Sequence, residues 1–165
     1  MQNCGTHYPG EHGHRNATFR PTSEPPGYTT SQGTAGHYLA STTLTEGRFS
    51  LFRWDMSSTS GGPSPHFHRT YAETFYILAG TVRLYDGHTW FDANPGDLLY
   101  VPPGGIHAFR NDSGAPASML MLLSPGADRE AYFAELAQIT AEQRELTDDE
   151  WTDLLTRHDN VMVTD

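Results

Sequence analysis

The sequence predicts an all-β fold that carries an N-terminal arm and short C-terminal α-helices. Charged residues are only 18% of the 165-residue chain, whereas glycine (16), proline (11) and aromatic residues (12%) are plentiful, a mixture typical of a turn-rich β fold. Short apolar runs alternate with turn signals between residues 36 and 123, and helical periodicity begins only after residue 126. A chain of this length fits one domain and can bury a core without disulfides.

Residues 1–30 are predicted to form the arm. Proline and glycine recur in this stretch, and neither strand nor helix periodicity is present. The arm holds His12-Gly13-His14, which has no alternating strand around it and no carboxylate at a useful spacing. We therefore interpret this pair as a flexible polar segment rather than a metal site. Cys4 is the only cysteine, so no disulfide can form within the chain.

Residues 36–123 are predicted to form short strands separated by turns, which indicates an antiparallel sandwich or barrel. Asp86-Gly87 has the signature of a two-residue type I′ hairpin turn. Alternation does not decide whether Arg53 or Trp54 faces inward on its strand. The predicted strands are 48–55, 74–79, 81–85, 88–92, 98–101, 106–111 and 117–123, with a loop at 57–62.

Helical periodicity replaces strand alternation after residue 126. Residues 131–139 place their apolar side chains on one stripe. The segments 140–143 and 147–150 both fit the capping-box pattern, and the second is predicted to open a helix. That helix has Trp151, Leu154, Leu155 and His158 on one face, which we expect to pack against the barrel. The chain is thus divided into an arm (1–30), a barrel (31–125) and a helical extension packed on the barrel (126–165).

The charge and apolar content exclude several classes of function. The formal net charge is −10, which argues against a nucleic-acid partner because no basic surface is available to neutralise phosphates. All ten basic residues are arginine, so Schiff-base chemistry and a lysine base are excluded. No apolar segment approaches the roughly 18 residues of a membrane span, and the first twenty residues lack the apolar run of a secretory signal. We expect a cytoplasmic protein without membrane contact.

Two histidines one residue apart, His66 and His68, are followed by Glu73 and by the distant His107. Because side chains alternate faces along a strand, His66 and His68 point the same way. Glu73 has the wrong parity for that face of an unbroken strand, so residues 69–72 are predicted to form a turn, with Glu73 facing inward on the next strand. A proline-glycine turn just before His107 can aim this residue into the same cavity.

Three imidazoles and one carboxylate predict a site for one divalent transition metal ion per chain. The donor types do not choose among Fe, Mn, Ni, Co, Cu and Zn. The set contains no thiolate and leaves room on the metal for water or substrate, which favours a catalytic site over a closed structural one.

These residues resemble the two sequence motifs of the cupin superfamily. The resemblance covers residues 45–123 and implies a single jelly-roll β-barrel with the metal inside. Gly61 lies one residue closer to His66 than the usual pattern has it. Cupins of this length usually form homodimers, in which the arm could add to the partner's sheet and hide a sheet edge. The matching residues are Gly61, His66, His68, Glu73 and Gly80 in the first motif and Gly96, Pro102, Gly104, His107 and Asn111 in the second.

Four side chains are candidates for substrate contact. Parity places Phe75 and Ile77 on the face of the carboxylate ligand and Phe109 on the face of the last histidine, so these three are predicted to wall an apolar pocket, with plain core packing as the alternative. Tyr71 lies in the predicted turn near the ligands. Such a pocket suits an aromatic or polyketide-like small molecule more than a sugar.

Residues 72–80 resemble the small flavonol (quercetin) dioxygenase-like cupins, a family in which dioxygen attacks the activated substrate. There the metal-ligating carboxylate also takes the substrate proton, a catalytic role that Glu73 would hold here. We favour a dioxygenase on this basis. Two alternatives stay open: a redox-neutral cyclase or isomerase in which the metal acts as a Lewis acid, and a small-ligand-binding protein without turnover. No helix-turn-helix accompanies the barrel, which disfavours a transcription regulator.

Overall fold

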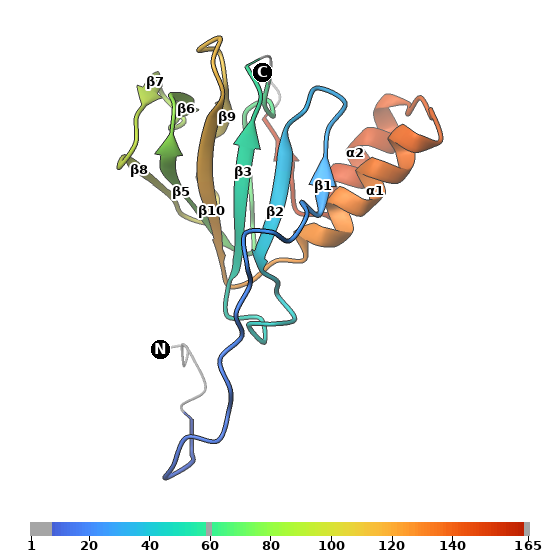
Figure 1. Ribbon diagram of the computed structural model, residues 1–165. Coiled ribbons are helices and arrows are strands. Elements are labelled where there is room, and N and C mark those ends of the chain that lie inside the picture. The colour runs from blue at the N-terminus through green and yellow to red at the C-terminus, as the bar shows by residue number, and fades with distance from the viewer. Residues whose placement is uncertain (1–7, 59–60, 164–165) are drawn as a thin grey trace.

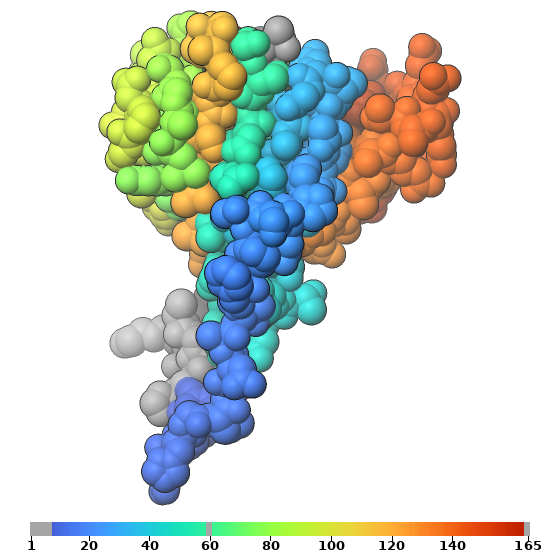
Figure 2. Space-filling view, in the orientation of Figure 1, coloured from blue at the N-terminus to red at the C-terminus, as the bar shows by residue number. Residues whose placement is uncertain are grey.

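The computed structural model describes residues 8–58 and 61–163. Residues 1–7 of the predicted arm, with Cys4 among them, and residues 59–60 of the loop predicted at 57–62 lie outside the described part. The irregular segment 8–27 leads away from the rest of the molecule (Figures 1 and 2). Its exchange between the two chains of a homodimer stays a prediction. Within the described residues, no helix has the length and apolar character needed to cross a membrane.

The barrel is built from antiparallel sheets of short strands, as the all-β prediction requires. The largest sheet has six strands in the order β1-β2-β3-β10-β5-β8. A three-stranded sheet has the order β7-β6-β9, and a two-stranded sheet pairs β11 with β4. In chain order the strands are β1 (Tyr28–Thr29), β2 (Ala35–Ala40), β3 (Ser50–Met56), β4 (His66–Phe67), β5 (Ala72–Ala79), β6 (Val82–Tyr85), β7 (Trp90–Ala93), β8 (Leu98–Val101), β9 (Ala108–Arg110), β10 (Ala117–Ser124) and β11 (Val161–Met162).

The seven predicted strands are confirmed, with ends shifted by at most two residues. Burial alternates along the central strands β3 and β10, because one face of each strand lies against the core. This alternation decides the open question on β3. Trp54 faces inward and is 8% exposed, whereas Arg53 faces outward, with its Nη2 atom 3.0 Å from a carboxylate oxygen of Asp55.

The hairpin between β6 and β7 corrects one prediction. Its tip is Gly87-His88 rather than Asp86-Gly87, and only Gly87 has a positive φ, of 92°, whereas a type I′ turn needs two such residues. The reason is the Asp86 side chain, whose Oδ1 atom accepts hydrogen bonds from the backbone N–H groups of His88 (2.9 Å) and Thr89 (2.8 Å). Asp86 therefore supports the turn from its base.

Two helices follow β10, namely α1 (Arg129–Ala141) and α2 (Asp148–Arg157). The capping box at Thr147 and Glu150 is confirmed and opens α2. The matching pattern at 140–143 lies at the end of α1, where Glu142 is the C-cap, so it opens no helix. The prediction for Trp151 is also wrong: this side chain is 39% exposed, while Leu154 is the buried residue of α2.

Helix α1 belongs to the core of the domain. Both helices lie beside the β1 and β2 edge of the large sheet (Figure 1). Phe133 of α1 is 7% exposed and is part of the main hydrophobic cluster. The centroid of its ring lies 5.0 Å from that of Tyr28 and 5.2 Å from that of Trp54, distances at which aromatic pairs contribute beyond their buried area. Phe133 thus packs α1 against the large sheet.

Replacing Phe133 with alanine should destabilise the whole domain, because it removes the aromatic contact between α1 and the sheet. We expect the free energy of unfolding to fall by about 3–5 kcal/mol, measured by urea denaturation. Phe19→Ala is the matched control, since Phe19 is 86% exposed and its loss should change the stability by less than about 0.5 kcal/mol. Equal effects of the two substitutions would show that α1 does not share the core.

Candidate metal centre

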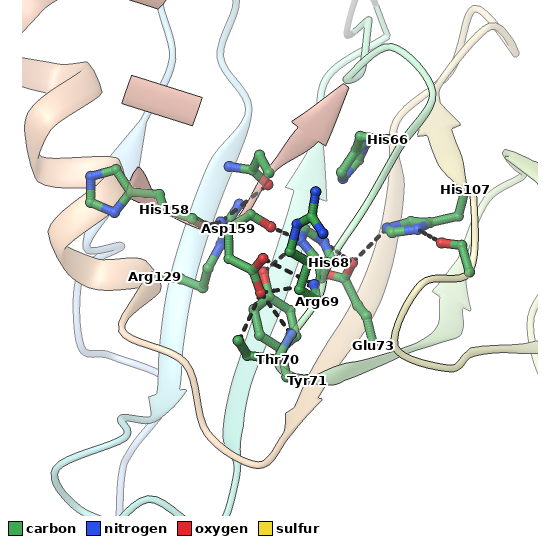
Figure 3. A network of polar contacts seen from close by, with 12 residues as sticks. His66, His68, Arg69, Thr70, Tyr71, Glu73, His107, Arg129, His158 and Asp159 are labelled. Carbon is green, nitrogen blue, oxygen red and sulfur yellow. Dashed lines mark hydrogen bonds and ion pairs between the residues drawn. The ribbon is translucent and has the colours of Figure 1, made fainter. Parts of the chain in front are cut away.

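Three separate segments bring the four predicted ligands together (Figure 3). His66 lies on β4, which ends at Phe67, and the chain bends before β5 begins at Ala72. The predicted turn between His68 and Glu73 is therefore present. His107 comes just before β9 and exchanges two backbone hydrogen bonds with His66, of 3.0 and 2.9 Å between nitrogen and oxygen.

The four side chains converge in the protein interior. Each offers one ligand atom such that all four atoms lie within 4.8 Å of one another. The residues are 5% (His66), 3% (His68), 4% (Glu73) and 0% (His107) exposed. The Oε2 atom of Glu73 lies 3.2 Å from Nε2 of His68 and 2.8 Å from Nε2 of His107. The ligand atoms thus surround a single point.

The opposite nitrogen of every imidazole is held by a backbone carbonyl group. A carbonyl oxygen can only accept a hydrogen bond, so each Nδ1 atom carries a proton. The Nε2 atoms of His68 and His107 face Glu73, where each donates a hydrogen bond when protonated and can bind a metal ion when it is not. Such partners fix the tautomer and the ring orientation of metal-binding histidines. The Nδ1 atoms lie 2.8 Å from the oxygen of Ser64 for His66, 2.6 Å from that of Asp159 for His68 and 3.0 Å from that of Gly105 for His107.

The electrostatics suit a cation. Burial raises the pKa of Glu73, but the hydrogen bonds from His107 and His68 outweigh burial and hold this pKa well below its usual range. Burial, with the neighbouring His107, lowers the pKa of His66 to about 4, so this imidazole is neutral at neutral pH. Three imidazole nitrogens and one carboxylate oxygen, all buried, fit a divalent transition metal ion, which would replace the hydrogen bonds between Glu73 and the two imidazoles.

Asp159 is a site residue that sequence reasoning missed. It follows α2 in the left-handed backbone conformation, with φ of 56°. Its carboxylate accepts hydrogen bonds from the N–H of Arg69 (2.9 Å), from the N–H of Thr70 (2.9 Å) and from the hydroxyl of Thr70 (2.7 Å). Its backbone carbonyl is the partner of His68. The C-terminal segment therefore holds the loop that carries a ligand, as Figure 3 shows.

A cavity of about 440 Å³ lies beside the ligands. His66, His68 and Glu73 line it from the barrel. Five further lining residues are aromatic side chains from the barrel and from α1. These are Tyr28, Trp54, Phe109, Tyr132 and Phe133. The volume lies within the usual range of small-molecule sites, which are mostly apolar with a few placed polar groups.

Comparisons with known proteins agree with this architecture. Residues 53–123 match the family described as "Cupin domain". Residues 53–123 are a cupin domain. A predicted oxalate decarboxylase from Thermotoga maritima superposes with a TM-score of 0.59 at 16% identity over 66% of this chain and 99% of that one. KdgF from Halomonas sp. superposes with a TM-score of 0.56 at 17% identity over 67% and 94%. Identities this low show a shared fold alone.

Curated relatives resemble the cupin region in sequence. Quercetin 2,3-dioxygenase of Bacillus subtilis (strain 168) is 38% identical over 61 residues, which are 37% of this chain and 18% of that protein. Mannose-1-phosphate guanylyltransferase RfbM of Salmonella typhimurium is 31% identical over 87 residues, or 53% and 17%. The chain thus spans less than a fifth of the length of either relative.

The cupin barrel places the four predicted substrate contacts differently. Phe109 lines the cavity, whereas Tyr71, Phe75 and Ile77 are not among its lining residues. Phe75 and Ile77 do face inward, but both are 0% exposed within the packed core. Tyr71 supports a ligand, because its ring stacks on that of His68 with centroids 4.4 Å apart and its hydroxyl lies 2.9 Å from Nδ1.

Metal analysis of the cupin, purified without a histidine tag, should find one divalent transition metal ion per chain. His66→Ala removes one of four donors, so we expect its metal affinity to fall at least about 100-fold, measured by competition with a chelator. His14→Ala is the control, since it breaks the other His-X-His pair, which is exposed. A His66→Ala protein with full metal content would overturn the assignment of the site.

Asp159→Asn should weaken metal binding without removing a ligand. The amide keeps the shape of the side chain but places an N–H₂ group or a neutral oxygen against the three donor groups of Arg69 and Thr70. The hydrogen bonds that hold the loop around His68 therefore weaken. We expect about a tenfold loss of metal affinity in the same chelator titration. Asp153→Asn changes an exposed carboxylate of α2 and should leave the affinity unchanged. Equal affinities of the two variants would mean that Asp159 does not position His68.

Proposed function

We propose that this cupin is a metal-dependent oxidoreductase, most specifically a dioxygenase, that acts on an aromatic or polyketide-like small molecule. One observation carries the proposal: a buried set of three histidines and one glutamate opens into a cavity with an aromatic wall. The similarity of the cupin region to a quercetin 2,3-dioxygenase supports the same reaction class.

The cavity wall suits a ring-bearing substrate. Tyr28 and Trp54 stack with their ring centroids 6.0 Å apart and their planes inclined by 18°, and Phe133 packs against both. These side chains offer flat apolar surface, on which an aromatic ring stacks favourably. They would hold the substrate against the ligand side of the cavity and exclude water from it.

Glu73 is the residue that we propose to take a proton from an acidic hydroxyl group of the substrate. Hydrogen bonds from His107 and His68 outweigh burial and keep its pKa low, so it is a carboxylate at neutral pH. A nearby cation would lower the pKa of this carboxylate further, so Glu73 would act best as a base when it leaves the metal or is hydrogen-bonded. When bound, the metal ion would polarise the substrate and support electron transfer to dioxygen.

Oxygen consumption separates the dioxygenase from a redox-neutral cyclase or isomerase. A dioxygenase adds both atoms of O₂ to its substrate, which supplies the electrons, so no further reductant is needed. We expect the metal-loaded protein to consume one O₂ per substrate turned over from a panel of phenolic and polyketide compounds, and ¹⁸O₂ to label the product with two atoms. Glu73→Gln should reduce the rate by at least about 100-fold, whereas His14→Ala should retain it.

The same assay under anaerobic conditions shows whether the dioxygenase proposal is wrong. Turnover that continues at an unchanged rate under anaerobic conditions would exclude the dioxygenase and support the redox-neutral alternative. Saturable binding of panel compounds with no product in either condition would support a ligand-binding protein.

A further inference from the structure

Arg129 stands at the start of α1 and borders the cavity. Its Nη1 atom donates hydrogen bonds to the backbone oxygen of His158 (3.2 Å) and to Oδ1 of Asn160 (3.3 Å). Its guanidinium carbon lies 4.3 Å from the centre of the Tyr132 ring, which is a cation–π distance. These contacts fix the side chain between α1 and the turn after α2, and Figure 3 shows it beside Asp159 and His158.

Arg129 has no carboxylate partner among the described residues, although acids outnumber bases by two to one in this chain (20 against 10). Eight of the ten arginines form ion pairs within 4.0 Å. Arg69 and Arg129 form none with the residues that the structure describes. Arg69 is exposed on a loop, whereas Arg129 is partly buried. A partly buried cation without a counter-ion is costly, and binding an anion there would offset that cost.

One edge of the guanidinium group remains free. Both fixed hydrogen bonds use Nη1. Neither Nε nor Nη2 has a hydrogen-bond partner among the described residues, and neither is one of the fully buried unpartnered atoms. The Nε–Nη2 edge of arginine offers two parallel N–H groups that match the two oxygens of a carboxylate.

The side chains around Arg129 place a second requirement on a ligand of the cavity, namely a flat apolar ring. Trp54 and Phe133 line the same cavity as Arg129, and the ligands His66 and Glu73 line it from the barrel side. The Arg129 carbon also lies 5.6 Å from the centre of the Phe133 ring. A molecule that satisfied the whole cavity would therefore combine a flat apolar ring with an anionic group at one end.

We propose that Arg129 binds the carboxylate of an aromatic acid, through its Nε–Nη2 edge, while the ring of that acid stacks on Trp54 and Phe133. The inference rests on the proposed use of this cavity as the substrate site, and it narrows the substrate class from aromatic molecules to aromatic carboxylates. Arg129 thereby determines specificity and takes no part in the bond-breaking step.

The test compares 2-naphthoate with its neutral analogue 2-naphthamide by isothermal titration calorimetry of the metal-loaded full chain. The wild type should bind naphthoate about tenfold or more tightly than naphthamide. Arg129→Met should lose about that factor for naphthoate and keep its affinity for naphthamide, which also shows that the cavity remains folded. Arg129→Lys keeps the charge without the planar guanidinium group, so its affinity for naphthoate should lie between that of the wild type and that of Arg129→Met. Arg144→Met removes an exposed arginine next to α2 and should bind as the wild type does.

Three results would overturn the inference: equal affinity of the wild type for the two probes, binding of neither, or unchanged naphthoate affinity in Arg129→Met. Repeating the titration after removal of the metal shows whether the ion binds the carboxylate instead. An affinity for naphthoate that falls when the metal is removed, but not in Arg129→Met, would reject this inference and leave the proposed function intact. The protein could also prefer naphthoate to naphthamide through Arg129 and yet consume no oxygen with any substrate. That result would reject the dioxygenase and retain the inference about Arg129.

Discussion

The hydrogen bonds from the Nδ1 atoms of three imidazoles to backbone carbonyl groups are the constraint on which the site depends. They fix the three rings, and the Nε2 atoms of His68 and His107 lie against Glu73. For His66 and His107 the carbonyl lies two residues earlier in the chain, so each strand entry orients its own ligand. For His68 the carbonyl belongs to Asp159, 91 residues away in sequence. The candidate metal centre therefore has all its hydrogen-bond partners only when the C-terminal segment is docked on the barrel.

The helical extension consequently does more than cover a sheet edge. Strand β11 pairs with β4, so that Met162 lies opposite His66, and α1 contributes Phe133 to the core. The same segment supplies Arg129 and Tyr132 to the cavity. The barrel thus provides the ligands, while the extension shapes the space in front of them. In the proposed function, this division would combine metal chemistry in the barrel with a substrate preference set by a separate part of the chain.

The sequence predicted what depends on local pattern. Alternation predicted the strands, and parity predicted the break between His68 and Glu73, because both are properties of neighbouring residues. Parity also gave the correct inward face for Phe75, but it carries no information on depth in the barrel, so of the three predicted wall residues only Phe109 lines the cavity. Asp159 and Arg129 act through contacts with segments that are distant in sequence. No local pattern marks such residues, and only the docking of the extension reveals them.

The coordination of the bound metal is the most direct test of this account. X-ray absorption at the metal edge, measured on protein purified without a tag, should show three imidazole nitrogens and one carboxylate oxygen at about 2.0–2.2 Å. The remaining positions should be filled by light donors from water or substrate. A spectrum with fewer than three imidazoles, or one with sulfur scattering from a thiolate, would contradict the four-ligand centre.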